Sequence, residues 1–241
     1  MLDSPKPQSN LKDGAAVAFA LIFPSLVTWV YFVWLAGDSA GVQQASYSVG
    51  KAIQFGFPLV WVVVVQRQRL RWERPGTAGL PSGVGFGVLV VAAMLLMYHV
   101  FLKPAGLFAG AADAVHGKVK GFGVDSITKY AALGLFYSVG HSFLEEYYWR
   151  WFVFAQLRRL ASLRTAIAMS SLGFMAHHVV VLATFFGWGS PATYLFSFAI
   201  AGGGAVWAWL YARTDSIYGP WLSHLLVDAG IFLIGYDMVK L

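Results

Sequence analysis

The stretch Phe143-Leu144-Glu145-Glu146-Tyr147-Tyr148-Trp149-Arg150-Trp151-Phe152 places two carboxylates and a guanidinium in an otherwise apolar, aromatic run. The whole chain contains only three glutamates, and two of them stand here. An ionised side chain at the centre of a bilayer costs roughly 2.5–3.5 kcal/mol on insertion scales. Three such residues so close together therefore indicate a functional site inside a membrane-spanning helix.

The composition of the chain indicates a polytopic membrane protein. Its 241 residues are 58% hydrophobic and 12% charged, with a mean hydropathy of +0.63, whereas soluble domains carry about 25% charged residues. There is no cysteine, which excludes disulfides and a cysteine nucleophile. The net charge of +6 comes from basic residues in short loops between apolar runs, a pattern typical of membrane topology. We therefore expect a lipid bilayer and no nucleic acid as partner.

Apolar runs of about 20 residues, the length that crosses a bilayer, predict an all-α bundle of about seven transmembrane helices. The predicted spans are residues 14–36, 46–66, 83–103, 127–157, 163–187, 191–212 and 217–236. Residues 1–13 are predicted to form a cytoplasmic tail, and residues 14–241 a single domain whose motif-bearing core lies at about 127–236. The only sizeable loop, residues 104–126, is expected either to lie on the membrane interface or to cap the site.

The distribution of basic residues predicts the orientation of the chain. Arginines cluster at loop edges, where the positive-inside bias is strongest, and these are Arg67, Arg69, Arg71, Arg74, Arg158, Arg159 and Arg164. Placing them in the cytoplasm makes the N-terminus cytoplasmic and leaves Lys51 among the basic residues on the far side. A compact multi-pass chain without a cleavable presequence fits a bacterial inner membrane.

The fourth predicted span presents a polar face. The residues that share it at helical spacing are Ser138, His141, Ser142 and Glu145. Glu146 lies about 100° further round and precedes Arg150 by four residues, the favoured spacing for an acid–base pair. If Arg150 neutralises Glu146, Glu145 remains unpaired and can act as a general base. The alternative is that all three residues form a structural ion-pair network that locks helices together.

Two later spans carry histidines that can meet this face. His177 and His178 are adjacent in the fifth span, so we expect at most one of them to face Glu145 directly. His224 and Asp228 stand one turn apart in the seventh span and share a face, as an imidazole and its orienting acceptor would. At about 1.5 Å per residue, these groups lie deep enough in their spans to share one buried cavity.

Three ordered motifs carry a resemblance to a known family. They are Glu145-Glu146-x-x-x-Arg150, Phe174-x-x-x-His178 and His224-x-x-x-Asp228, on successive motif-bearing spans between about residues 130 and 236. In this order they resemble the motifs of the CPBP family, which comprises CAAX prenyl endopeptidases and bacteriocin-processing proteins and is also called the Abi family. The first three spans match this family only in being hydrophobic.

The resemblance implies a helical intramembrane endopeptidase. By position it makes Glu145 and His178 the activators of the attacking water, with Glu146 and Arg150 in support. It makes His224 and Asp228 the pair that stabilises the oxyanion. An ionised aspartate cannot donate to an oxyanion, so Asp228 either orients His224 or is protonated. The spacing from Phe174 favours His178 over His177.

The residues also allow a metal-dependent version of the same hydrolysis. The side chains of Glu145, His178, His224 and Asp228 are all possible zinc ligands, and zinc would activate a water for attack. The chain lacks a His-Glu-x-x-His motif, and the resemblance implies a metal-free glutamate mechanism. We therefore expect no cofactor, with zinc as the alternative.

Three functions compete at this level. The first is an endopeptidase that cleaves a membrane-associated peptide, whether prenylated, lipidated or bearing a sorting signal. The second is a non-enzymatic membrane protein for peptide-toxin self-immunity or partner binding. The third is a proton-coupled transporter, which buried Glu, His and Asp would suit but which the absence of an inverted repeat disfavours.

Overall fold

The computed structural model describes residues 7–69, 77–121 and 123–239, and every regular element in these ranges is helical. In chain order the elements are α1 (Pro7–Trp29), η1 (Val30–Trp34), α2 (Ala40–Val60), η2 (Trp61–Val65), α3 (Leu80–Met97), η3 (Tyr98–Leu102), α4 (Ala109–Gly121), α5 (Ile127–Leu135), η4 (Phe136–His141), α6 (Ser142–Glu146), η5 (Tyr147–Phe154), α7 (Ala155–Leu160), α8 (Leu163–Phe186), α9 (Pro191–Thr214) and α10 (Tyr218–Val239), where η denotes a π-helical segment.

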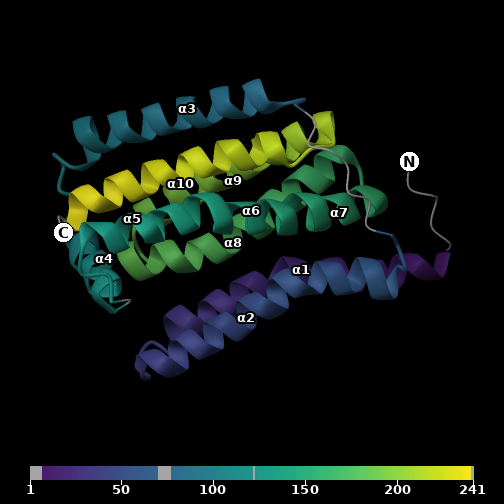
Figure 1. Cartoon of the computed structure of the whole chain (residues 1–241), viewed down its shortest axis with the longest axis horizontal. Helices are drawn as coiled ribbons and strands as arrows, with labels where there is room; N and C mark the ends of the chain where they lie inside the picture. Colours follow the sequence, from purple (N-terminus) through teal and green to yellow (C-terminus); the bar gives the residue numbers. More distant parts are fainter. Residues whose placement is uncertain (1–6, 70–76, 122, 240–241) are drawn as a thin grey trace.

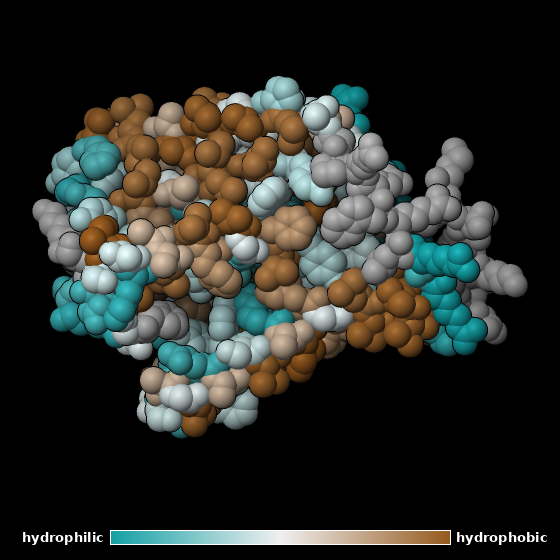
Figure 2. Space-filling model, in the orientation of Figure 1, coloured by the Kyte–Doolittle hydropathy of each residue, from teal (hydrophilic) through white to brown (hydrophobic). Residues whose placement is uncertain are grey.

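The predicted all-α bundle of about seven spans is confirmed. Six helices of the described chain are long and apolar enough to cross a membrane, and they are Leu11–Trp34, Ala40–Val65, Leu80–Leu102, Leu163–Phe186, Pro191–Thr214 and Tyr218–Val239. The seventh element is the unbroken helix over residues 127–160, in which α and π segments alternate. Apolar side chains cover the middle of the visible face, and hydrophilic residues lie toward its ends (Figure 2). The chain is an integral multi-pass membrane protein.

Local sequence signals set the ends of the helices. Ser39, Ser126 and Ser162 each precede a helix and accept a hydrogen bond from a backbone N–H of its first turn, which satisfies a group that the helix leaves unpaired. Gly187 ends α8 with a φ of 87°, a backbone conformation that other residues adopt with strain. The turns between spans are therefore encoded locally.

The helices pack so that α3 runs along α10 and α8 runs along α9, with α1 against α8 (Figure 1). The α3–α10 contact depends on glycine, because a Cβ on Gly83 would lie 2.1 Å from the carbonyl oxygen of Gly219. Small residues allow such close backbone approach between membrane helices. Helices α1 and α2 form a separate pair along one side of the bundle (Figure 1).

A polar cluster ties this α1–α2 pair to α7. Asp13 is 5% exposed and accepts hydrogen bonds from Gln66 Nε2 at 2.9 Å and Trp61 Nε1 at 3.3 Å. Gln66 in turn pairs with Gln156 of α7 at 3.0 Å. Helix α1 begins at Pro7, so residues 7–13 belong to the first helix and not to the predicted polar tail, while residues 1–6 lie outside the described ranges. The prediction of a polar tail did not include the hydrogen bonds that Asp13 accepts from Trp61 and Gln66.

Two further placements refine the expectations from sequence. The loop 104–126 contains helix α4, which packs against α8 and α10. The positive-inside argument counts Lys51 among the basic residues outside the cytoplasm. Lys51 lies within α2, inside a candidate membrane span.

Candidate active site

The acidic pair lies near the middle of the long helix over residues 127–160. Glu145 and Glu146 end the five-residue segment α6, with the π-helical segments η4 and η5 on either side. Such segments are rare, and within α-helices they occur frequently at functional sites. Glu145 is 2% exposed and Glu146 is 0% exposed, so both carboxylates are withdrawn from water and need partners.

Glu146 and Arg150 form the ion pair that their spacing predicts. Arg150 Nη1 lies 3.0 Å from Glu146 Oε1, and Arg150 Nη2 donates to the carbonyl oxygen of Gly204 at 3.2 Å. The guanidinium carbon also lies 5.0 Å from the ring centroid of Phe174 and 5.1 Å from that of Trp207. The arginine is thus enclosed by a carboxylate, a carbonyl and two aromatic faces.

Glu145 is surrounded by imidazoles. Its Oε1 lies 3.5 Å from His177 Nε2 and 3.9 Å from His141 Nε2, and its Oε2 lies 3.7 Å from His224 Nε2. Among the described residues, the only basic groups within 4.0 Å of the Glu145 carboxylate are histidine nitrogens. Glu145 therefore lacks the permanent cation that Glu146 has, as the sequence predicts.

The two adjacent histidines of α8 have different surroundings. His177 points its Nε2 at Glu145, and its ring lies parallel to that of Trp149 with 5.8 Å between centroids. His178 Nδ1 lies 2.9 Å from the carbonyl oxygen of Phe174, which leaves Nε2 available to the site. The structure thus brings His177 closest to Glu145, whereas the spacing from Phe174 favours His178, and the identity of the working histidine stays a prediction.

His224 connects the two carboxylates of the acidic pair. Its Nδ1 lies 2.8 Å from Glu146 Oε1, and because an ionised carboxylate only accepts, Nδ1–H is the donor. This fixes the tautomer and directs Nε2 toward Glu145 and toward Asp228, whose Oδ1 is 3.6 Å away. The His224 ring also stacks on Trp207 with centroids 4.3 Å apart. Asp228 lies beside His224 as their one-turn spacing predicts.

Several buried polar atoms at the site have no hydrogen-bond partner among the described residues. They are Glu146 Oε2, His141 Nε2, His177 Nδ1, Trp149 Nε1 and Arg150 Nη1, the last of which still lies at ion-pair distance from Glu146. Buried polar groups are normally satisfied, and each exception calls for an explanation. Unused donors and acceptors in the site suit the binding of water or a peptide group.

Two side chains at the site are not among the site residues that the sequence predicts. His141 was placed on the face of Glu145 but given no role, although it lies one helical turn before Glu145 and within 3.9 Å of it. Trp207 stacks on His224 and flanks Arg150. The i, i+4 spacing was a usable signal for His141, whereas nothing in the motifs points to Trp207.

One group of side chains has the geometry to hold a metal ion. Ligand atoms of Glu145, His177 and His178 all lie within 4.8 Å of one another. Three protein ligands with a water in the fourth position are what catalytic zinc sites use. His178 also has the backbone acceptor at Nδ1 that metal-bound histidines usually have. This group includes His177 and omits His224 and Asp228, so it differs from the ligand set proposed from sequence.

Comparison with known proteins gives a match over the motif-bearing part of the chain. The family model described as type II CAAX prenyl endopeptidase Rce1-like matches residues 127–230. No curated protein and no solved structure matches the chain. The matched range contains all three motifs and nearly coincides with the range over which they resemble the CPBP family. Residues 127–230 are therefore similar to proteins of the type II CAAX prenyl endopeptidase Rce1-like family.

Proposed function

We propose that this protein is an intramembrane endopeptidase that hydrolyses a peptide bond of a membrane-associated substrate with water activated by Glu145 and a histidine. The observation that carries the proposal is the contrast between the two carboxylates. Glu146 is paired with Arg150 at 3.0 Å, whereas the basic groups around Glu145 are histidines at 3.5–3.9 Å. A buried carboxylate without a permanent counterion is suited to take and return a proton.

The reaction follows from the placement of these groups. Glu145 takes a proton from a water bound beside it and His177, and the hydroxide adds to the carbonyl carbon of the scissile bond. His224, fixed by Glu146 through Nδ1, presents Nε2 to the developing oxyanion when that nitrogen carries a proton. The proton on Glu145 then passes to the leaving amine as the carbon–nitrogen bond breaks. Arg150 acts through Glu146 and touches no reacting atom.

Zinc is the alternative means of activating the same water. Glu145, His177 and His178 would be its ligands, and the ion would supply a bound hydroxide at neutral pH. The unpaired Nδ1 of His177 and the backbone bond of His178 fit such ligation. In that case His224 and Asp228 would still face the oxyanion.

The substrate is proposed as a peptide that carries a membrane anchor. The description of the matched family, a CAAX prenyl endopeptidase, favours a prenylated peptide, while other lipidated or sorting-signal peptides are the alternatives. The side chains packed beside the site are aromatic, among them Trp149, Phe174 and Trp207, and such surroundings favour an apolar substrate. The host membrane is proposed to be a bacterial inner membrane with the N-terminus in the cytoplasm.

A cleavage screen tests the proposal. Purified protein in lipid vesicles is incubated with a library of membrane-tethered peptides, with and without a chelator, and products are identified by mass spectrometry. Cleavage that survives the chelator supports the glutamate mechanism, and cleavage abolished by the chelator and restored by Zn²⁺ supports the metal. Binding of a peptide without cleavage, in an otherwise folded protein, would favour the non-enzymatic function instead.

A further inference from the structure

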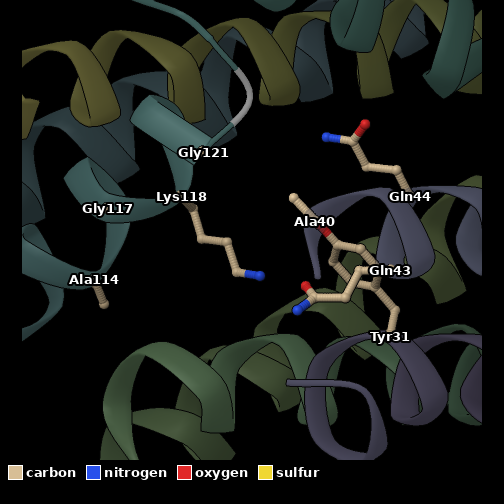
Figure 3. Close-up of a pocket in the computed structure, with 8 residues that line it drawn as sticks. All are labelled: Tyr31, Ala40, Gln43, Gln44, Ala114, Gly117, Lys118 and Gly121. Carbon is tan, nitrogen blue, oxygen red and sulfur yellow. The ribbon is translucent and has the colours of Figure 1, made fainter. Parts of the chain in front are cut away.

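A pocket lies between α4, η1 and the first turns of α2. It has a volume of about 330 Å³, and its lining includes Tyr31 of η1, Gln43 and Gln44 of α2, and Gly117, Lys118 and Gly121 of α4 (Figure 3). None of these residues belongs to the candidate active site. The space on the α4 side is open, because a Cβ on Gly117 or on Gly121 would meet nothing within 4 Å. The volume is at the lower end of the range for ligand sites, so the pocket suits a small group.

The pocket lies at the level where two candidate membrane spans end. The first of these spans ends at Trp34, and the second begins at Ala40, which is part of the pocket lining. Helix α4 has 13 residues, too few to cross a bilayer, and Lys120 on it is exposed. Lipid headgroups occupy this level on either side of the hydrocarbon core. The pocket is therefore placed to receive a lipid headgroup.

Lys118 is the only charged residue in the lining of this pocket. Its side chain extends from α4 toward Tyr31 and Gln43 in Figure 3. Its Nζ lies 4.8 Å from the ring centroid of Tyr31 and 5.2 Å from that of Phe32. No acidic side chain of the described residues comes within 4.0 Å of this nitrogen. An ammonium without a carboxylate partner keeps its three donors for an anion.

A carboxamide on α2 supplies a second donor. Gln44 is exposed, and its side chain makes no hydrogen bond with a described residue. The neighbouring Gln43 is already engaged, since its Nε2 donates to the carbonyl oxygen of Asp38 at 2.9 Å and to that of Ala36 at 3.4 Å. Gln43 thus holds the turn that precedes α2, while Gln44 can donate to a bound group. A phosphate has more than one acceptor oxygen and can bind an ammonium and a carboxamide together.

The lining also discriminates between kinds of headgroup. It contains no carboxylate that could pair with a choline or ethanolamine cation. The aromatic face that such a cation would use is already covered, because Lys118 Nζ lies over the Tyr31 ring. A zwitterionic headgroup would therefore bring its own cation close to the ammonium of Lys118, whereas an anionic headgroup has no cation to place there. The arrangement favours an anionic lipid.

We propose that this pocket binds the phosphate of an anionic glycerophospholipid, with Lys118 Nζ and Gln44 Nε2 as donors and the acyl chains in the bilayer. The site is independent of the proposed peptidase activity. One headgroup contacts α4 and α2 together, so a bound lipid links α4 to the α1–α2 pair. A soluble phosphate compound offers the same oxygens without acyl chains, and competition between the two separates these sources.

Lipid titration of the purified protein tests the site. The protein in detergent is mixed with phosphatidylglycerol or with phosphatidylcholine of the same acyl chains, and bound lipids are counted by native mass spectrometry. We expect the first phosphatidylglycerol to bind about fivefold more tightly than the first phosphatidylcholine, the contribution of one lysine near an anionic lipid. Inorganic phosphate in excess should leave this difference in place, because it lacks the apolar contacts of the acyl chains.

Two matched pairs of variants on α4 locate the effect. Lys118→Met should remove the preference for phosphatidylglycerol, whereas Lys120→Met, which loses the same charge at an exposed position, should retain it. Gly117→Leu should also remove the preference, because the new side chain occupies open space in the pocket. Gly110→Leu should retain it, since Gly110 is equally unobstructed and does not line the pocket. Matching unfolding temperatures show that the variants are folded.

Three results would overturn the lipid site. The first is a preference that survives in Lys118→Met or that Lys120→Met loses to the same extent, because the lysine in the pocket would then contribute nothing of its own. The second is equal binding of both lipids to the wild-type protein. The third is displacement of the bound lipid by inorganic phosphate, which would assign the pocket to a soluble phosphate compound. None of these results depends on peptide cleavage, so the proposed function keeps its own separate test.

Discussion

Neighbouring residues of the acidic pair have different partners because successive side chains on a helix point about 100° apart. Glu146 contacts Arg150, one turn further along the same helix, and His224 of α10. Glu145 turns toward α8, where His177 meets it at 3.5 Å. The same helical geometry therefore gives the two carboxylates different partners, an arginine for Glu146 and histidines for Glu145.

Removal of the guanidinium is expected to destabilise the fold more than neutralisation of Glu145. Arg150→Ala leaves Glu146 buried without its counterion, and breaking a buried pair in this way costs about 3–5 kcal/mol. Glu145→Gln is nearly isosteric and should change stability much less. Thermal unfolding in detergent compares the two, with Glu146→Gln/Arg150→Met as the control that removes both charges. Equal unfolding temperatures for the two single variants would contradict the assigned pairing.

The two histidines of α8 are separated by their effect on turnover. His177→Gln should lower kcat by about 100-fold or more, the size of a general acid–base contribution, because His177 Nε2 lies 3.5 Å from Glu145. His178→Gln should have a smaller effect in the metal-free mechanism. The measurement is kcat on one cleaved peptide for both variants. A larger loss for His178→Gln would support the role that the spacing from Phe174 predicts.

At the scale of elements, the apolar runs predicted the spans well because length and hydropathy alone decide them. The π-helical segments around Glu145 were not predicted. Their backbone hydrogen bonds lie within the helix, but packing against neighbouring helices, as well as the local sequence, decides where such segments form. Helix α4 has weak amphipathic character, and its position against α8 and α10 is set by tertiary contacts. The motifs placed Glu145, Glu146, Arg150, His224 and Asp228 close together because helical spacing fixes their faces, whereas the choice between adjacent histidines depended on the rotation of α8.

The contact between α3 and α10 offers a matched pair of glycines on one helix. Gly83→Ala introduces a Cβ that would lie 2.1 Å from the carbonyl oxygen of Gly219, whereas a Cβ on Gly85 meets nothing within 4 Å. We expect Gly83→Ala to reduce the free energy of unfolding by about 1–3 kcal/mol and Gly85→Ala to leave it nearly unchanged. Thermal unfolding in one detergent compares them. Equal stabilities would contradict the close approach of these helices.

At the scale of the whole molecule, seven spans place the beginning of α1 and the end of α10 at opposite ends of the bundle (Figure 1). The candidate active site lies within residues 127–230, which match the family model, whereas α1 to α4 lie outside this range.

The chain has no cysteine, so single-cysteine variants report topology without background. Gly37→Cys and Gly189→Cys lie in turns at one end of the bundle, and Ala161→Cys and Ser216→Cys lie in turns at the other. In sealed right-side-out vesicles, a membrane-impermeant thiol reagent should label the first pair and spare the second until the vesicles are permeabilised. A difference within either pair would contradict the seven-span arrangement, and a reversed pattern would contradict only the cytoplasmic N-terminus.

The measurement that tests the central claim most directly is the initial rate at which Glu145→Gln cleaves the best peptide, relative to the wild-type protein in the same vesicles. Both proteins should show matching unfolding temperatures, so that the rate reports chemistry and not folding. The account predicts a loss of at least 100-fold to 10,000-fold, the range for removal of a general base. A rate within a few-fold of the wild-type rate would contradict the assignment of Glu145 as the residue that activates water.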